Sequence, residues 1–243
     1  MTTSPPSQFL STESPAHTRE VQTLFNRLAP SYDHAVAGYS LGQDLRWRKE
    51  LIDAVDPRPG ERALDLACGT GLVLNRLEAR VGPGGALGID QNWAMLDRAR
   101  ANGRSRRLLR ANVVYLPFRD SQFDLVTAGY LLKYVSLPKL AAEVHRVLRP
   151  GGRFGGYDFS RPTNGLVGTG YSVYLHHVLP RLARESSADP TDLRRVFDFI
   201  GHTAENSGWE SRAKDCFEAA GFDRVQLTTS LGGASTRVVA TRT

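Results

Sequence analysis

The stretch ALDLACGTGLV, residues 63–73, combines an apolar run, an acid and two glycines at a spacing that could bind a ligand. Asp65 lies within the apolar run, and glycines follow at positions 69 and 71. Glycine adopts backbone conformations that a Cβ atom forbids, so a ligand can approach the main chain closely. In an open α/β sheet the first strand-to-helix turn usually lies where ligands bind. We therefore predict a ligand-binding turn here.

This turn differs from the turn of a dinucleotide site. A dinucleotide site needs a third glycine where this chain has Leu74, because the helix must pack close to the pyrophosphate. Asp65 is also better suited to a cation or an amino group than to a phosphate. We expect a ligand with a positively charged end.

Polar residues also close the next two predicted strands. Asp90 ends GGALGID, where a carboxylate can accept hydrogen bonds from both hydroxyls of a ribose. Asn112 ends the third strand and can present its amide to an adenine edge, with residues 116–118 following as an apolar wall. Each acid alone could simply cap a helix. Together, the three strand ends favour S-adenosylmethionine as the ligand.

Composition places the chain among globular α/β proteins. It has 243 residues, of which 41% are hydrophobic and 23% charged, enough for one domain with a buried core. The two cysteines, Cys68 and Cys216, have neither disulfide-framework nor metal-binding spacing, so we predict no metal site. The first residues resemble no secretory signal, and no run of 18 apolar residues could span a membrane. We expect a cytoplasmic protein.

The formal net charge of +6 could indicate nucleic acid or an anionic membrane surface as a partner. The densest basic run is RSRRLLR, residues 104–110, and no aromatic residue interrupts its arginines. A groove that binds single strands would want such aromatic residues. We interpret the run as a solvated helix end and loop, and expect no nucleic acid partner.

Hydrophobic periodicity predicts the elements that position these residues. The spacing of Val21, Leu24, Phe25 and Leu28 predicts an amphipathic helix that Pro30 ends, and a second helix is expected over residues 43–56. Short apolar runs then alternate with helices, which is typical of a mainly parallel sheet covered on both faces. The expected strands are RALDLA, GGALGID, RLLRAN, FDLVTAG and RFGGYDF, with helices over about residues 70–80, 92–102 and 138–148 between them. Helices near residues 166–180, 190–206 and 210–220 and two antiparallel strands, VQLTTS and RVVATR, complete the expected set.

The chain resembles a known family: the ubiquinone/menaquinone biosynthesis C-methyltransferases, within the class I S-adenosylmethionine-dependent methyltransferases. The motifs DLACGTG, GIDQNWAML, ANVVYLPFRDSQFDLVT, HRVLRPGGRF and DFSRPTN carry the resemblance, together with SYDHAVAGYSLGQDLRWR nearer the start. It implies a Rossmann-like, doubly wound, mainly parallel sheet of seven strands with an antiparallel C-terminal strand. The expected organisation is a flexible tail (1–17) and one methyltransferase domain: an N-terminal helical lid (18–56), a cofactor-binding core (57–160), substrate-covering helices (161–222) and closing strands (223–243).

The resemblance implies which residues bind S-adenosylmethionine. The glycines and Thr70 of DLACGTG match the segment that holds the methionine part, and Tyr32 matches a tyrosine of the lid. Gly129 stands where the family usually has a small hydroxyl residue, so that contact would be lost. The predicted cofactor-binding residues are Tyr32, Asp65, Ala67, Gly69, Thr70, Gly71, Asp90, Gln91, Asn112, Val113 and Gly129.

Departures from the family pattern fall on the side of the methyl acceptor. The chain reads LLKY where the family reads GLRN, which places Lys133 for an arginine and Tyr134 for an asparagine. Asp158 replaces a glutamate in DFSRP, and His177 matches a histidine of the family's HVLP stretch. We take these four as candidate catalytic residues, although buried packing is the commoner role for each.

Three functions are consistent with this pattern. The first is C-methylation of a quinol or phenol such as a quinone precursor, and the second is O-, N- or C-methylation in a specialised natural-product pathway. The third is a descendant that binds the cofactor without transferring methyl. The apolar, aromatic segment near residues 166–180 suits a small aromatic, lipophilic acceptor. Peripheral contact with a membrane and a homodimer are left open.

Overall fold

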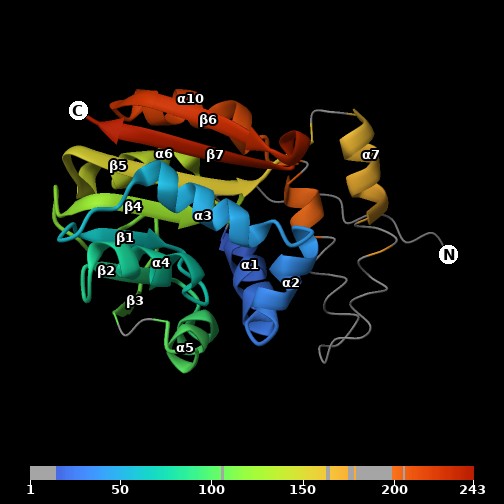
Figure 1. The fold of residues 1–243 in the computed structure, drawn as a ribbon, viewed down its shortest axis with the longest axis horizontal. Coiled ribbons are helices and arrows are strands. Elements are labelled where there is room, and N and C mark those ends of the chain that lie inside the picture. Colours follow the sequence, from blue (N-terminus) through green and yellow to red (C-terminus); the bar gives the residue numbers. More distant parts are fainter. Residues whose placement is uncertain (1–14, 105–106, 163–164, 175–177, 179–198, 205) are drawn as a thin grey trace.

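The computed structural model describes residues 15–104, 107–162, 165–174, 178, 199–204 and 206–243 (Figure 1). Three helices precede the first strand. Helices then follow β1, β2 and β4, whereas a loop without a helix joins β3 to β4. The elements are α1 (Pro15–Leu28), α2 (Tyr32–Tyr39), α3 (Asp44–Val55), β1 (Ala63–Leu66), α4 (Leu72–Val81), β2 (Ala86–Asp90), α5 (Trp93–Ala101), β3 (Leu108–Arg110), β4 (Phe123–Gly129), the 3-10 helix η1 (Leu132–Tyr134), α6 (Leu137–Val147), β5 (Leu148–Phe159), α7 (Gly165–Val173), α10 (Trp209–Ala219), β6 (Phe222–Ser230), the 3-10 helix η4 (Leu231–Gly233) and β7 (Ser235–Arg242).

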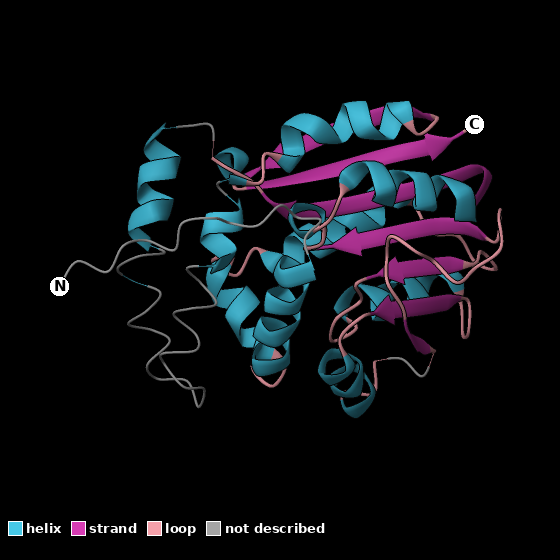
Figure 2. Ribbon diagram, turned by 180° about the vertical axis from the view of Figure 1, so that it is seen from behind, coloured by secondary structure: helices cyan, strands magenta, loops and turns pink. Residues whose placement is uncertain are grey.

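The strands form one seven-stranded sheet in the order β3-β2-β1-β4-β5-β7-β6. Strands β1 to β5 run parallel, and β7 runs antiparallel to both β5 and β6. The predicted doubly wound sheet with an antiparallel C-terminal strand is therefore confirmed (Figure 2). Because the strand order reverses between β1 and β4, a crevice opens at the carboxyl ends of these two strands, where such folds bind ligands.

Helices cover both faces of the sheet, as the continuous apolar strands require. On one face, α3 and α4 bury Leu51, Val55 and Leu74 in one apolar cluster. On the other face, α6 and α10 bury Leu140 and Phe217 in a second cluster. The apolar residues of α6 follow the helical period of Leu137, Leu140, Ala141 and Val144, which explains why this helix was predictable.

Some boundaries differ from those expected. α1 begins at Pro15, two residues before the predicted end of the tail at residue 17. The short helix α2 was missed, because its eight residues carry only a weak apolar periodicity. β5 begins at Leu148, directly after α6, so that the PGG turn lies inside the strand rather than before it. The predicted strands and the pairing of β6 with β7 are otherwise confirmed.

The C-terminal helices are described in part. α7 and α10 match two of the predicted helices, and residues 199–204 are helical within the predicted 190–206 segment. In the part of the chain that the structure describes, no helix is both long and apolar enough to cross a lipid bilayer. Within the same part, no group of three histidine, cysteine or acidic residues could hold a metal ion.

Candidate functional site

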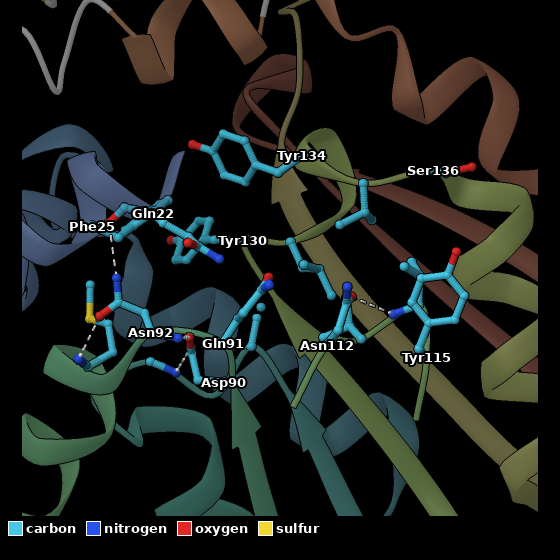
Figure 3. Close-up of a pocket in the computed structure, with 18 of the residues that line it drawn as sticks. Gln22, Phe25, Asp90, Gln91, Asn92, Asn112, Tyr115, Tyr130, Tyr134 and Ser136 are labelled. Atoms are coloured by element: carbon cyan, nitrogen blue, oxygen red, sulfur yellow. Dashed lines mark hydrogen bonds between the residues drawn. The ribbon is translucent and has the colours of Figure 1, made fainter. Parts of the chain in front are cut away.

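A cavity of about 270 Å³ opens at the carboxyl ends of β1, β2 and β4 (Figure 3). Side chains from α1 and α2 close it on the side of the N-terminal helices. The lining consists of Gln22, Phe25, Tyr32, Ala67, Gly69, Asp90, Gln91, Asn92, Met95, Asn112, Val113, Val114, Tyr115, Gly129, Tyr130, Leu131, Tyr134, Val135, Ser136 and Lys139. The predicted ligand turn and the strand ends at Asp90 and Asn112 thus meet in one cavity.

The glycine turn presents bare main chain to this cavity. Ala67 and Gly69 both have positive φ, 49° and 54°, which turns the chain sharply after β1. A Cβ atom added at Gly69 would meet only the Ala67 carbonyl oxygen at 3.9 Å and Tyr32 at 4.0 Å. There is therefore room beside Gly69 for a ligand to contact the backbone.

Asp90 is held rigidly at the end of β2. Its Oδ2 accepts a hydrogen bond from the Gly69 amide at 2.9 Å, and its Oδ1 accepts one from the Asn92 amide at 2.8 Å. Burial raises the pKa of Asp90 to about 6, and these amide bonds oppose that rise. A carboxylate oxygen has more than one lone pair, so each can also accept from a ribose hydroxyl.

The loop after β3 supplies the opposite wall. The Asn112 Oδ1 accepts from the Val114 amide at 3.1 Å, and Asn112 and Tyr115 form an isolated bridge. Asn112 and Val113 line the cavity as predicted. The expected apolar wall of residues 116–118 is not part of the lining, since Leu116 and Phe118 turn into the core. Val113, Val114 and Leu131 provide apolar surface instead.

The N-terminal helices are tied to the glycine turn by hydrogen bonds. The Thr70 hydroxyl donates to Asp33 at 2.6 Å, and Arg104 forms an ion pair with the other oxygen of Asp33 at 2.7 Å. Asn92 donates to the Gln22 carbonyl of α1 at 3.1 Å. Thr70 is buried by these contacts and does not line the cavity. Its hydroxyl ties α2 to the glycine turn, and Tyr32 of α2 does line the cavity.

Asp65 and Gly71 lie beside the cavity rather than in its lining. The Asp65 Oδ1 accepts from the Thr127 hydroxyl at 2.7 Å, and only 1% of Asp65 is exposed. Its Oδ2 has no hydrogen-bond partner among the described residues. A Cβ atom at Gly71 would meet Arg104 Cβ at 3.1 Å, so this glycine lets α4 approach the segment after α5. Both residues were predicted to bind the cofactor, and neither is part of the cavity lining.

Burial gives Asp65 an unusual effect on stability. Its pKa is raised to about 7, against about 3.9 for an aspartate in an unfolded chain, so the folded protein keeps a proton that the unfolded chain has lost. The free energy of unfolding therefore falls as the pH rises from about 4 to about 7. We expect Asp65→Asn to flatten this dependence, as measured by urea unfolding of both proteins across that range. If the free energy of unfolding falls equally steeply with pH in the two proteins, Asp65 is not the group responsible.

Gly129 lines the cavity, and the place of the family's hydroxyl residue is taken by a tyrosine ring. A Cβ atom at Gly129 would meet Tyr157 Cε1 at 3.1 Å and the Tyr157 hydroxyl at 3.3 Å. The two residues are register partners on β4 and β5. The Tyr157 hydroxyl is itself buried without a hydrogen-bond partner among the described residues. Glycine at position 129 therefore leaves room for the Tyr157 ring.

The candidate catalytic residues separate into two groups. Tyr134 lines the cavity, on the far side from Asp90 in Figure 3. Lys133 and Asp158 do not line it: they form a buried ion pair, in which Asp158 also accepts from the Lys133 and Phe159 amides. His177 lies outside the described residues. The prediction that Lys133 and Asp158 face the acceptor is therefore not what the geometry shows.

The ion pair instead supports Tyr134 from behind. The Lys133 Nζ lies 4.3 Å from the centroid of the Tyr134 ring. The same ring stacks on Phe199, with centroids 5.9 Å apart, and meets Phe25 edge-on at 5.7 Å. Burial raises the pKa of Tyr134 well above its ordinary value, so its hydroxyl stays protonated. Tyr134 thus lines the cavity, and the Lys133 ammonium, paired with Asp158, lies against its ring.

Several lining residues were missed from the sequence. Phe25 was assigned to the core face of the first helix, and nothing in its spacing marks it as a ligand contact. Tyr130 follows Gly129 with a φ of 58° and donates to Asp44 of α3 at 2.8 Å. Ser136 and Lys139 enter from the start of α6. Only Tyr130 could have been inferred, since it directly follows a predicted strand end.

S-adenosylmethionine fits the residues of this cavity. The open backbone at Gly69 can receive its amino-acid part, Asp90 its ribose hydroxyls, and Asn112 with Val113 its adenine. The glycine turn has no third glycine of the kind that a pyrophosphate site requires. Leu74 stands at that position and is fully buried in the core. The donors, acceptors and apolar walls are those that a nucleoside with an amino-acid end requires.

Comparisons with known proteins agree with this site. The model of the ubiE/COQ5 methyltransferase family matches residues 13–242. A demethylmenaquinone methyltransferase of Lactobacillus johnsonii is 34% identical over 218 residues, which cover 86% of this chain and 87% of the relative. A 2-phytyl-1,4-naphtoquinone methyltransferase of a Nostoc species is 37% identical over 174 residues, covering 68% and 76% of the two chains.

The fold also matches solved structures. An S-adenosylmethionine-dependent methyltransferase from Thermotoga maritima superposes with a TM-score of 0.63 at 17% identity, covering 91% of this chain and 99% of that one. At this identity the likeness concerns the fold alone. Taken with the family match over nearly the whole chain and the cavity at the strand ends, it leads to one conclusion: the chain belongs to the ubiE/COQ5 methyltransferase family and is an S-adenosylmethionine-dependent methyltransferase.

Proposed function

We propose that this enzyme methylates a ring carbon of a quinol, the reduced form of an isoprenoid quinone precursor. The observation that supports it most directly is the 34% identity, over most of both chains, to a relative named demethylmenaquinone methyltransferase. A second relative is named for a phytyl-naphthoquinone substrate. Both names describe a fused aromatic ring with a long apolar tail as the acceptor.

The cofactor half of the cavity supports methyl transfer. When bound, S-adenosylmethionine would supply an electrophilic methyl group, to which an attacking carbon bonds while the methyl–sulfur bond breaks and S-adenosylhomocysteine leaves. The Gly69 backbone would hold the amino-acid end of the cofactor and Asp90 its ribose, while Gln22, Phe25 and Tyr32 line the cavity from α1 and α2. Holding both reactants in line and excluding water supplies most of what such a displacement needs.

The acceptor half of the cavity is aromatic and apolar. Phe25, Tyr130, Leu131, Tyr134 and Val135 surround the space on the side of η1. Burial raises the pKa values of Tyr130 and Tyr134 well above the ordinary value, so both rings carry hydroxyl groups rather than phenolates. The Tyr130 hydroxyl already donates to Asp44, so Tyr134 is the one of the two that can donate to a quinol oxygen. When the quinol hydroxyl loses its proton to water, the ring carbon beside it becomes nucleophilic, and the hydrogen bond from Tyr134 stabilises the resulting oxyanion. The hydrogen on the methylated ring carbon also leaves to water as a proton.

Product analysis tests this proposal. The purified chain is incubated with methyl-deuterated S-adenosylmethionine and a naphthoquinol that carries a short prenyl chain, kept reduced with dithionite. We expect the label on a ring carbon, identified by mass spectrometry and by NMR. A labelled methoxy group, or no labelled product beside active cofactor binding, would contradict C-methylation of a quinol.

A small aromatic molecule of a specialised pathway is the second candidate acceptor. Tyr134 favours it, because this bulky side chain lines the cavity where the resembling family has asparagine. Turnover of the prenylated quinol and of an unprenylated phenol by the wild type and by Tyr134→Asn separates the two candidates. Faster turnover of the quinol by the wild type supports the first. Faster turnover of the phenol, reversed in Tyr134→Asn, supports the second.

A further inference from the structure

One face of α6 carries lining residues of the cavity and, further along the helix, two charged side chains. Ser136 and Lys139 line the cavity where α6 begins, and Glu143 and Arg146 follow on the same helix. Successive members of this set are three or four residues apart, so the side chains lie along one stripe of the helix. A single helix face thus connects the cavity lining with the charged pair.

The loop after β3 forms the wall that would hold the adenine of the cofactor. Asn112, Val113, Val114 and Tyr115 all line the cavity, and Tyr115 lies at the same end of it as Ser136 in Figure 3. The Asn112 Oδ1 accepts from the Val114 amide at 3.1 Å, which fixes where this side chain presents its acceptor and where its donor. A purine edge at Asn112 would therefore meet a fixed pattern of donor and acceptor.

Glu143 and Arg146 hold the main chain directly beyond this wall. The Glu143 Oε2 accepts a hydrogen bond from the Leu116 amide at 2.6 Å, and the Arg146 Nη2 donates to the Leu116 carbonyl oxygen at 3.0 Å. The Arg146 Nη1 donates to the Phe118 carbonyl oxygen at 2.7 Å. Both main-chain groups of Leu116, the residue that follows Tyr115, are thus bonded by side chains of α6.

The two side chains also hold each other. The Arg146 Nε and Nη2 donate to the two oxygens of Glu143, both at 2.8 Å. A bidentate pair of this kind fixes the orientation of both groups. The bonds from Arg146 lower the pKa of Glu143, so the carboxylate is ionised at neutral pH. We call this pair the Glu143–Arg146 clamp.

We propose that Glu143 and Arg146 are positioning residues for the cofactor, because they keep the adenine wall at the distance from α6 at which it recognises its purine. Neither side chain lines the cavity, so both act through Leu116 on the wall that contains Asn112. Without the clamp the loop would shift, and an adenine would lose hydrogen bonds that depend on the place of the Asn112 amide. The proposal concerns the purine alone and does not depend on which acceptor is methylated.

Two ligands that differ only in the purine test this role. S-adenosylhomocysteine carries an amino group at C6 of the purine, whereas S-inosylhomocysteine carries a carbonyl oxygen there, so donor and acceptor are exchanged along that edge. Calorimetry measures both affinities for the wild type and for Arg146→Ala. We expect Arg146→Ala to weaken the binding of S-adenosylhomocysteine about fivefold, the value of about one hydrogen bond, and that of S-inosylhomocysteine less. The preference for adenine should therefore fall, whereas a general loss of folded protein would weaken both ligands by the same factor.

The matched control is Arg149→Ala. Arg149 forms an ion pair with Asp124 at 2.8 Å, and its other hydrogen bond goes to the Ser121 carbonyl oxygen, beyond the wall. Its removal should leave both affinities unchanged. If Arg146→Ala does not fold, Arg146→Lys carries the same test, since lysine keeps the charge and loses the planar fork. An unchanged preference for adenine in the folded Arg146 variant, or an equal change in Arg149→Ala, would overturn the proposal.

Discussion

Asp90→Ala should weaken the binding of S-adenosylhomocysteine by at least about tenfold. The carboxylate lines the cavity at the end of β2, and a hydrogen bond to a charged group contributes about 1.5–3 kcal/mol. The substitution also removes the acceptor of the Gly69 and Asn92 amides, so the glycine turn loses its support. Isothermal titration calorimetry of the two proteins measures the change in affinity.

The control for this prediction is Asp97→Ala. Asp97 is an exposed acid on the neighbouring helix α5, and it does not line the cavity. Its removal changes the net charge by the same amount and should leave the affinity unchanged. An equal affinity for the Asp90 variant and the wild type would remove Asp90 from the cofactor site.

Breaking the buried pair of Lys133 and Asp158 should cause the largest loss of stability of any change considered for this protein. Removing one partner of a buried pair leaves an uncompensated charge and costs about 3–5 kcal/mol. Lys133 is 2% exposed and Asp158 is 0% exposed, so water cannot solvate the charge that remains. We expect the free energy of unfolding of Lys133→Met, measured with urea, to be lower than that of the wild type by this amount.

The double variant Lys133→Met with Asp158→Leu provides the control. Replacing a whole buried pair by apolar residues is often neutral, so much of the stability should return. Some loss will remain, because the Asp158 carboxylate also accepts from the Lys133 and Phe159 amides. A single variant as stable as the wild type would show that the pair is not charged in the folded protein.

Turnover separates the positioning role of Lys133 from a merely structural one. If the ammonium holds the Tyr134 ring, the stability-restored double variant should still lose kcat while KM for the cofactor is retained. The contact that carries this expectation is the 4.3 Å separation of Lys133 Nζ from the Tyr134 ring centroid.

The order of the strands and helices was predictable because local pattern decides it. Each parallel strand is a short apolar run, and each covering helix such as α6 repeats its apolar residues with the helical period. The strand ends at Asp90 and Asn112 were also predictable, since parallel strands bring their carboxyl ends to one edge. Local sequence thus locates the cavity and one half of its lining.

The orientation of the other predicted side chains depends on contacts between residues that are distant in the sequence. Asp65 turns inward because Thr127, on the neighbouring strand β4, offers it a hydroxyl. Lys133 and Asp158 were predicted as separate acceptor residues, yet they neutralise each other across the space between η1 and β5. Which way such side chains turn is decided by sheet register and packing, which no local spacing contains.

The surroundings of the basic run RSRRLLR also depend on contacts between distant residues. The basic run was interpreted as solvated because no aromatic residue interrupts it in the sequence. In the folded chain Trp93, from the start of α5, comes to lie beneath Arg110 of β3. This aromatic neighbour comes from α5, which lies outside the basic run in the sequence.

Identification of the natural acceptor tests the central claim most directly. The purified enzyme is incubated with methyl-labelled S-adenosylmethionine and with lipid and polar extracts of the source cells, and the labelled products are identified by mass. We predict that an isoprenoid quinone in the lipid extract gains the label and that Asp90→Ala abolishes it. Label found only on a water-soluble molecule of the polar extract would contradict a quinol acceptor.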